Sequence, residues 1–358
     1  EWNHWKRQHA PWWVEVSKCA PQEAFRDLER AFRSWRRGLA RRPRFKRKKS
    51  WDDNTARLTG SIRVLPRHVQ LPRIGRVRTK ERTGKLLTLL AGGRARVLSA
   101  TVSREADRWY VSLTCEVERP DPPVREGEPV GVDLGLGWFL ALSDGTRGQA
   151  PRPLGRALCL LRRRSKQLSR KQKGSRNHAR AALRLARLQR RVRCIRRDFL
   201  HKTTTWLVRT KPVIVVEDLN VRGLVRGRLS RPVADAGWGA FRRMLEYKAR
   251  WYGSQLVIAP RGFPSTRLCS RCGCLGPRMA LSERVFRCPG CGLEVDRDLN
   301  AALNLRSYGL AHLTGSTGSS PGSDACGDPS GGGTATCWST SHGSKKQEVT
   351  GHLSCFPR

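Results

Sequence analysis

The chain has 358 residues, with 71 Lys plus Arg against 29 Asp plus Glu and a formal net charge of +42. So large an excess of positive charge predicts a polyanionic partner such as nucleic acid. No apolar run approaches the roughly 18 residues of a membrane-spanning helix and no lipidation signal is visible, so a membrane role is not expected. Ribosomal or histone-like packing proteins are equally basic, so charge alone leaves that class open.

Residues 1–120 are expected to form a nucleic-acid recognition lobe. Pro21 opens a helix that Gly38 closes, and one face of this helix carries Phe25, Leu28, Phe32 and Trp35. Short strands are predicted at 61–64, 68–71, 96–102 and 108–117. Short strands joined by basic loops favour a small β-barrel.

A second lobe follows the linker Pro120-Asp121-Pro122-Pro123. Its first predicted strand, 129–134, carries Asp133 where a buried strand should be apolar, and the apolar run 137–143 completes a hairpin pattern. A carboxylate in such a strand is costly to bury unless it is paired or holds a cation. Taken alone, Asp133 is more simply an acid at a strand end that faces solvent.

The next segment, at about 156–205, is strongly basic. Between Leu161 and Leu200 lie sixteen Lys or Arg residues and one acid. An apolar helical stripe runs through Leu185, Leu188, Val192, Ile195 and Phe199. These features predict a helical hairpin with its turn near Gly174-Ser175, either a solvated basic helix packed on a core or a grip on the phosphate backbone. So many like charges on one helix repel one another unless phosphates neutralise them, which favours binding to the phosphate backbone. The expected contacts are Arg162, Arg163, Arg164, Lys166, Arg170, Lys171, Lys173 and Arg176.

Two further acids stand at predicted element boundaries. The apolar strand 212–217 ends in Glu217, and carboxylates at the carboxyl ends of buried strands are where α/β sheets place chemistry. A helix from Phe241 to Tyr252 and a strand at 255–259 follow. Asp298 precedes an Ala- and Leu-rich helix, where it is either a helix N-cap or a third functional acid.

Four cysteines form the most specific local signal. Cys269 and Cys272 form one C-x2-C pair, Cys288 and Cys291 form a second, and fifteen residues separate the pairs. This spacing predicts a closed, structural zinc site. No signal peptide is recognisable and the remaining cysteines are scattered, so disulfides are not expected. Cys274 breaks the spacing and is left out of the ligand set.

The three acids fit metal-assisted phosphodiester chemistry. Two divalent cations can activate a water and stabilise a leaving oxygen, and hard Mg²⁺ prefers carboxylate oxygens. The chain has only eight His and no H-x-x-x-H spacing, so a histidine-based zinc hydrolase is not expected. Asp133, Glu217 and Asp298 are therefore the candidate catalytic residues and ligands for Mg²⁺ or Mn²⁺.

Several motifs together resemble the TnpB (OrfB) family, encoded by bacterial insertion sequences, long labelled transposases and related to type V CRISPR effectors. They are Gly-Val-Asp-Leu-Gly at 131–135, Val-Val-Glu-Asp-Leu-Asn at 215–220, Asp-Ala-Gly-Trp-Gly-Ala-Phe at 235–241, Phe263-Pro264-Ser265, and Asp-Arg-Asp-Leu-Asn-Ala-Ala at 296–302. The motifs appear in the family's order, and the resemblance runs from about Trp5 to Leu310.

The resemblance implies an RNA-guided DNA endonuclease with an α/β, RNase H-like RuvC nuclease core. Its three acids fall on Asp133, Glu217 and Asp298, with Asp296 the rival for the third. A guide RNA from the element end would pair with double-stranded target DNA beside a short flanking motif, and the cut would leave a 5′-phosphate. The expected location is cytoplasmic, at the bacterial nucleoid. Alternatives are a strand-transferring transposase, a catalytically idle RNA-guided repressor and a zinc-ribbon protein that coats nucleic acid without a guide.

The expected domain order is a recognition lobe at 1–120, a nuclease core at 125–264, a zinc ribbon at 265–294, a last nuclease segment at 295–312 and a disordered tail at 313–358. The tail follows from its Gly, Ser and Thr content without apolar periodicity. The chain does not begin with Met, and the family's usual first few dozen residues are expected to be missing before Glu1.

Overall fold

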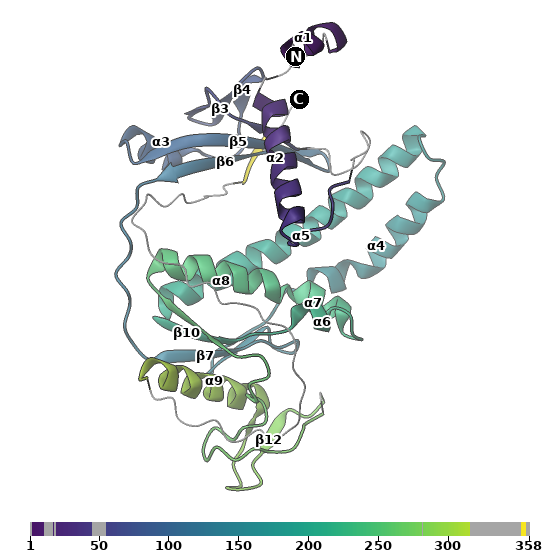
Figure 1. Cartoon of the computed structure of the whole chain (residues 1–358). Helices are drawn as coiled ribbons and strands as arrows, with labels where there is room; N and C mark the ends of the chain where they lie inside the picture. Colours follow the sequence, from purple (N-terminus) through teal and green to yellow (C-terminus); the bar gives the residue numbers. More distant parts are fainter. Residues whose placement is uncertain are drawn as a thin grey trace. The chain divides into compact units, whose positions relative to one another are not determined.

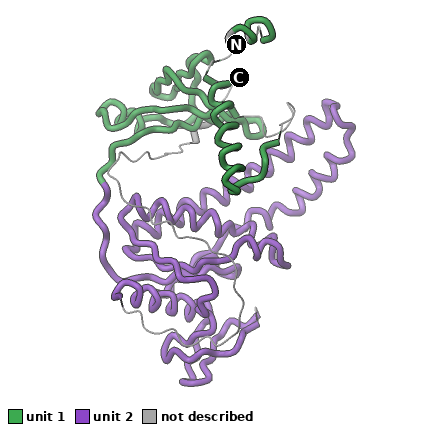
Figure 2. Tube along the Cα trace, viewed as in Figure 1, with its two compact units in different colours: residues 1–120, 335–358 green, residues 121–334 purple. Residues whose placement is uncertain are grey.

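The structure is a computed structural model that describes residues 2–10, 17, 19–44, 55–280, 282–315 and 352–355 (Figure 1). The chain divides into two compact units, residues 1–120 with 335–358 and residues 121–334 (Figure 2). Each unit is described by itself. No helix in the described ranges is long and apolar enough to span a membrane.

Unit 1 contains two sheets in its described residues. The first has the order β1-β5-β6-β14, with antiparallel neighbours: β1 (Thr55–Leu58), β5 (Ala95–Glu105), β6 (Arg108–Val117) and β14 (His352–Cys355). The second is the meander β2 (Arg63–Leu65), β3 (His68–Leu71) and β4 (Gly75–Arg78). The helices are α1 (Trp2–His9), α2 (Cys19–Arg36) and α3 (Gly84–Ala91). Leu58, Val69 and Val111 belong to one core cluster that both sheets share.

The expected β-barrel is not confirmed. Closure would require the two edge strands of a sheet to pair with each other, and β1 and β14 stand at opposite edges of an open sheet. The expected helix at 21–37 is present as α2, but Phe25, Leu28 and Trp35 on its apolar face are 55%, 47% and 40% exposed.

The expected tail differs from the structure at one place. Residues 352–355 form β14, which pairs with β6. The open edge of β6 offers unpaired N–H and C=O groups that such a strand satisfies. The tail between 316 and 351 lies outside the described residues.

Unit 2 is built on a five-stranded mixed sheet with the order β11-β10-β7-β8-β9. Its strands are β7 (Pro129–Asp133), β8 (Leu140–Leu142), β9 (Arg147–Gly148), β10 (Val213–Glu217) and β11 (Gln255–Ala259). β7, β10 and β11 are parallel, whereas β8 and β9 are antiparallel. The strands predicted at 129–134, 212–217 and 255–259 are confirmed. The strand predicted at 137–143 is shorter, because bends precede Leu140.

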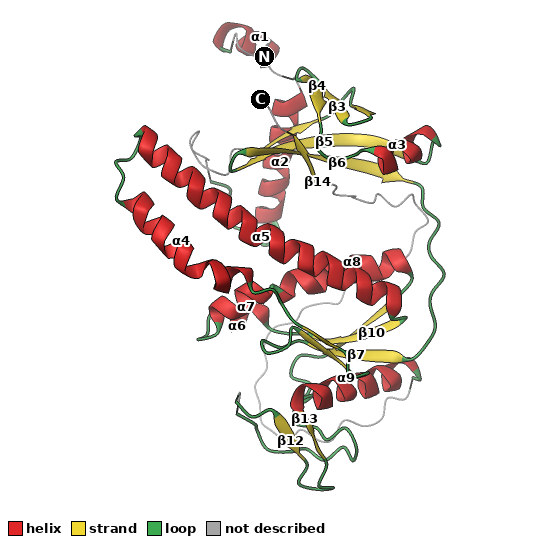
Figure 3. Cartoon of the chain, turned by 180° about the vertical axis from the view of Figure 1, so that it is seen from behind, coloured by secondary structure: helices red, strands yellow, loops and turns green. Residues whose placement is uncertain are grey.

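Helices cover both faces of this sheet. Figure 3 shows α5 (Arg176–Thr210) and α8 (Trp238–Tyr252) on one side and α9 (Arg297–Leu313) on the other. On the α5/α8 side the core is formed by Val132, Leu142, Leu207, Ile214, Val216, Phe241 and Leu245. On the α9 side it is formed by Val213, Val215, Val257, Ala259 and Leu305. Alternate residues of β10 therefore face opposite cores, which explains why the strand is wholly apolar.

The basic segment forms the predicted helical hairpin. α4 (Pro153–Ser169) packs along α5, and the Ser175 hydroxyl caps α5 by accepting a hydrogen bond from the backbone N–H of His178 at 3.1 Å. In the predicted stripe Val192 is buried, but Ile195 is 39% exposed. The remaining short helices are α6 (Val221–Leu224) and α7 (Ser230–Ala236).

A small ribbon lies between β11 and α9. Its hairpin consists of β12 (Val285–Arg287) and β13 (Glu294–Asp296). Phe286 is only 1% exposed and packs with the cysteines of the same ribbon. β13 leads directly into α9, so the ribbon determines where that helix begins.

Candidate functional site

Asp133 and Glu217 end two neighbouring parallel strands. In β7 and β10 Val132 stands opposite Val216, so the next residue of each strand, Asp133 and Glu217, leaves the sheet beside the other. Because side chains alternate along a strand, Asp133 shares the face of Gly131, and Glu217 shares the face of Val215, which packs in the α9-side core. Both carboxylates therefore point toward the face that α9 covers.

Glycine allows α9 to approach this face closely. A Cβ atom on Gly131 would lie 1.9 Å from the Ala302 carbonyl oxygen of α9, and one on Gly309 would lie 2.4 Å from a Val215 side-chain carbon. Ala301 and Ala302 are fully buried at the same interface. Small residues on both surfaces thus bring the backbone of α9 against the sheet and place its N-terminus near the carboxyl ends of β7 and β10.

The first turn of α9 separates the roles of its two aspartates. The Asp296 carboxylate is the N-cap and accepts hydrogen bonds from the backbone N–H groups of Asp298 and Leu299 at 3.1 and 3.0 Å. Asp298, for which the sequence also allowed the role of N-cap, is inside the helix and only 7% exposed. Asp296 also pairs with Arg147 at 3.2 Å. Asp298 is thus the acid left to face the other two carboxylates.

Electrostatic coupling indicates that the three acids share one site. Burial, followed by the charges of Asp298 and Glu217, raises the pKa of Asp133 to about 7. Burial also raises the pKa of Glu217, against a hydrogen bond from the Ser265 side chain. Among the described residues, the metal-binding side chains that lie close enough together to share one ion are four cysteines, whose sulfur atoms are all within 4.8 Å of one another. The three carboxylates do not form such a group within the described part of the chain.

Two arginines lie beside Asp298, and the sequence reasoning missed both. Arg284 Nη1 and Arg297 Nε lie 3.9 and 3.7 Å from Asp298 Oδ1. The Arg284 side chain is 53% exposed and its guanidinium lies 3.7 Å from the position that a Cβ on Gly137 would occupy. Arg284 comes from the ribbon, where nothing in its local pattern marks it. Its guanidinium is a half-exposed cation within ion-pair distance of Asp298.

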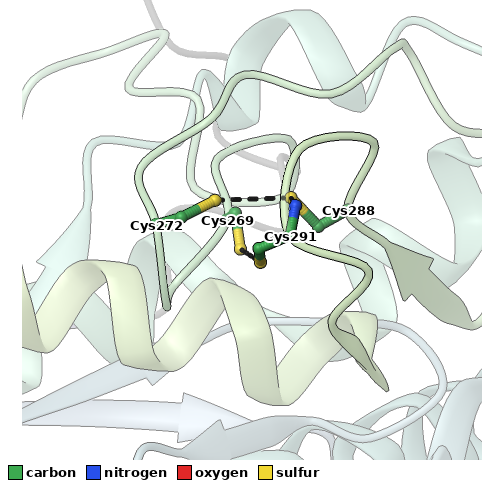
Figure 4. Close-up of side chains that lie close together, drawn as sticks. All are labelled: Cys269, Cys272, Cys288 and Cys291. Carbon is green, nitrogen blue, oxygen red and sulfur yellow. Dashed lines mark hydrogen bonds between the residues drawn. The ribbon is translucent and has the colours of Figure 1, made fainter.

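The four predicted cysteine ligands converge in the ribbon (Figure 4). The sulfur atoms of Cys269 and Cys291 lie 3.7 Å apart, and those of Cys272 and Cys288 lie 3.5 Å apart. A disulfide requires about 2.05 Å, whereas four thiolates about 2.3 Å from a central zinc lie roughly 3.8 Å from one another. The backbone N–H groups of Cys291 and Gly290 donate to the Cys288 sulfur and lower its pKa to about 6. The cluster therefore fits a tetrahedral metal.

Buried asparagines connect this ribbon to α9. Asn300 accepts from the Ser270 N–H at 3.0 Å and donates to the Leu268 carbonyl at 2.7 Å. Asn304 donates to the carbonyls of Ser265 and Leu268. Both amides are almost fully buried, at 0% and 2% exposure. The first cysteine knuckle and the helix that carries Asp298 are thus held as one piece.

The predicted nucleic-acid contacts lie on α4 and at the hairpin turn. Except for Arg164, which is half-buried, they are exposed: Arg162, Arg163, Lys166, Arg170, Lys171, Lys173 and Arg176. Arg164 donates to Gln167 at 3.3 Å. The exposed basic side chains lie on α4, on the turn after it and at the first residue of α5.

Known proteins are similar to this chain over most of its length. A family model described as "Probable transposase", of the OrfB type, matches residues 112–228, and one described as "Cas12f1-like, TNB domain" matches residues 238–305. A "Putative RNA-guided DNA endonuclease" from Streptomyces pristinaespiralis is 38% identical over 336 residues, which are 92% of this chain and 77% of that protein. The chain belongs to the TnpB (OrfB) family.

Two further likenesses were found. The Escherichia coli K12 protein named "Putative RNA-guided DNA endonuclease InsQ" is 32% identical over 328 residues, 86% of this chain and 79% of its own length. A cryo-EM structure of a Cas12f1-sgRNA-target DNA complex has 18% identity and a TM-score of 0.36, and the match covers 58% of this chain and 57% of that one. The TnpB assignment rests on the sequence relatives.

Proposed function

We propose that this TnpB-family chain is an RNA-guided DNA endonuclease that hydrolyses phosphodiester bonds of target DNA. One observation carries the proposal. Asp133 and Glu217 leave adjacent parallel strands side by side, and Asp298 approaches from α9 closely enough that its charge contributes to raising the pKa of Asp133 to about 7. Electrostatically coupled carboxylates, one buried and two half-buried, are the donor set expected of a metal-dependent nuclease.

Asp133, Glu217 and Asp298 would hold Mg²⁺ or Mn²⁺. The donor set fits, because carboxylate oxygens are hard ligands and because a nearby cation would offset the repulsion that raises the Asp133 pKa. Two bound ions would supply a metal-activated water and stabilise the leaving oxygen. Arg284 would contact a non-bridging phosphate oxygen, and Ser265 would hold Glu217 by the hydrogen bond it already makes.

The other parts have supporting roles. The cysteine cluster Cys269, Cys272, Cys288 and Cys291 would hold a structural Zn²⁺, because four protein ligands leave no open position for substrate. The exposed basic surface of α4 would bind the phosphate backbone of the guide RNA or of its duplex with DNA. Target choice would then rest on base pairing and on a short flanking DNA motif.

Two matched variants test the acid site. Asp298→Asn should abolish Mg²⁺-dependent cleavage by the protein purified with its RNA. Asp296→Asn should retain cleavage, because asparagine is as good an N-cap as aspartate. Equal cleavage by Asp298→Asn and the native chain would show that the site is assigned wrongly.

Sequencing the co-purified RNA separates the guided nuclease from its rivals. One dominant RNA that ends in a segment matching the element's flank is expected. Heterogeneous RNA would contradict guidance and favour a coating protein. Joined DNA products would indicate strand transfer, and a folded RNA complex inert in both Mg²⁺ and Mn²⁺ would indicate a repressor.

A further inference from the structure

An apolar cavity of about 410 Å³ lies beside the loop that follows Asp133. Its walls include Leu136 and Phe139 of that loop, Leu154 and Leu158 of α4, and Pro232 of α7. The volume is within the range of sites that bind small organic groups.

The wall of this cavity is rigid. Phe139 is 2% exposed and packs edge-to-face against Phe199 and Phe241, with ring centroids 4.9 and 5.3 Å apart. The Asp235 carboxylate, which also lines the cavity, accepts hydrogen bonds from the backbone N–H groups of Leu154 and Gly155 and pairs with Arg196. Its charge is therefore compensated within the protein.

The same loop connects the cavity to the acidic site. Gly135 lines the cavity, and a Cβ on Gly135 would lie 3.9 Å from Asp298 Oδ2. Arg152 has left-handed backbone geometry, with φ 46°, and its guanidinium donates to the carbonyls of Leu136 and Gly137 at 2.5 and 3.1 Å. A strained residue thus holds the loop in place. Arg231, which also lines the cavity, is exposed, and its guanidinium makes no hydrogen bond or ion pair within the described ranges.

We infer that this cavity binds one unstacked nucleobase of the single DNA strand that enters the acidic site. The inference rests on the proposed nuclease function and names a substrate subsite for it. An apolar recess accepts the base, the Arg231 guanidinium meets the neighbouring phosphate, and the shared loop sets the distance to Asp298. Single-stranded DNA gives up a base to such a pocket at low cost, whereas a duplex must first unpair it. The pocket thereby favours the displaced strand over intact duplex.

The test uses the full chain in buffer free of Mg²⁺ and Mn²⁺, so that binding is measured without cleavage. A 12-nucleotide thymidine strand and an abasic strand of equal length carry the same phosphates and differ only in bases. We expect Leu158→Trp, which fills the cavity, to lower the preference for the thymidine strand about tenfold, since stacking of one base accounts for that order of affinity. Cys159→Trp is the matched control, because Cys159 is the exposed neighbour on α4 and its replacement should leave the preference unchanged.

Photocrosslinking locates the base directly. A strand with 5-iodouracil should crosslink to Phe139 in the native chain and in Cys159→Trp, and at least fivefold less in Leu158→Trp. If Leu158→Trp does not fold, Ala150→Leu narrows the same cavity and replaces it. An unchanged base preference in the filled variants, or crosslinks only outside the cavity, overturns the inference. A native chain that crosslinks at Phe139, but whose complex with its co-purified RNA does not cleave matching target DNA with added Mg²⁺ or Mn²⁺, instead refutes the nuclease proposal.

Discussion

Asparagine at position 133 should stabilise the protein in the absence of divalent cations. The Asp133 pKa is about 7, whereas its ordinary value is 3.8. A carboxyl with a raised pKa ionises more readily in the unfolded chain than in the folded one, so ionisation favours unfolding. The penalty begins as the pH rises above about 4 and is complete above pH 7. A shift of this size corresponds to at most about 4 kcal/mol, and relaxation around the partly exposed side chain reduces it.

The assay compares urea unfolding of the native chain and Asp133→Asn at pH 4.5, 6 and 8, with zinc-loaded protein in buffer free of Mg²⁺. The advantage of the variant over the native chain should be no more than about 1 kcal/mol at pH 4.5 and should grow by about 2–3 kcal/mol between pH 4.5 and pH 8. Added Mg²⁺ should then stabilise the native chain at pH 8 by about 2.7 kcal/mol at a hundredfold excess over its Kd, and the variant far less. A stability difference that stays constant from pH 4.5 to 8 would refute the electrostatic coupling.

Two substitutions test the supports of the site. Gly131→Ala should cost at least about 1–3 kcal/mol of stability and impair cleavage, because its Cβ meets the backbone of α9 at 1.9 Å. Gly84→Ala, where a Cβ meets nothing within 4 Å, is the control, and equal melting temperatures for the two would contradict the close approach. Cys272→Ser should lose the zinc measured per chain by mass spectrometry, whereas Cys274→Ser should keep it. Retention of zinc by Cys272→Ser would exclude the four-sulfur site.

The strands and their acids could be predicted because local patterns determine them. The wholly apolar run before Glu217 and the single charge at Asp133 mark strand ends whatever the topology. The sequence does not state that β7 and β10 are adjacent and parallel, which is a pairing between residues more than eighty positions apart. The three acids come together only through the pairing of β7 with β10 and through the position of α9.

Other features depended on contacts that no local pattern encodes. Asp296 and Asp298 both stand at the start of the helical pattern, and only the hydrogen bonds of the first turn identify Asp296 as the cap. Arg284 lies in the ribbon fourteen residues before Asp298, so its proximity depends on the ribbon fold. The expected barrel is not confirmed in the described residues, because strand patterns predict strands but not which edges pair.

The residues from Asp296 to Ala302 position the helix as well as supply an acid to the site. Asp296 caps the helix, Asp298 faces the acidic site, Ala302 packs on the sheet and Asn300 ties the helix to the cysteine knuckle. Zinc and the acidic site should therefore be coupled mechanically. The coupling runs through the hydrogen bonds of Asn300 and Asn304, two side chains with 0% and 2% exposure.

Replacement of Asn300 by alanine tests the contribution of this side chain to the connection between the zinc ribbon and Asp298. The change leaves the Ser270 N–H buried without its acceptor, at a cost of about 1–3 kcal/mol, but touches neither a cysteine nor an acid. We expect zinc to remain bound while the Mg²⁺ concentration for half-maximal cleavage rises several-fold, because Asp298 loses its fixed position. Ser307→Ala, an exposed position on the same helix, should behave like the native chain. If Asn300→Ala lowers stability with no change in the Mg²⁺ dependence, the ribbon stabilises the fold without positioning the third acid.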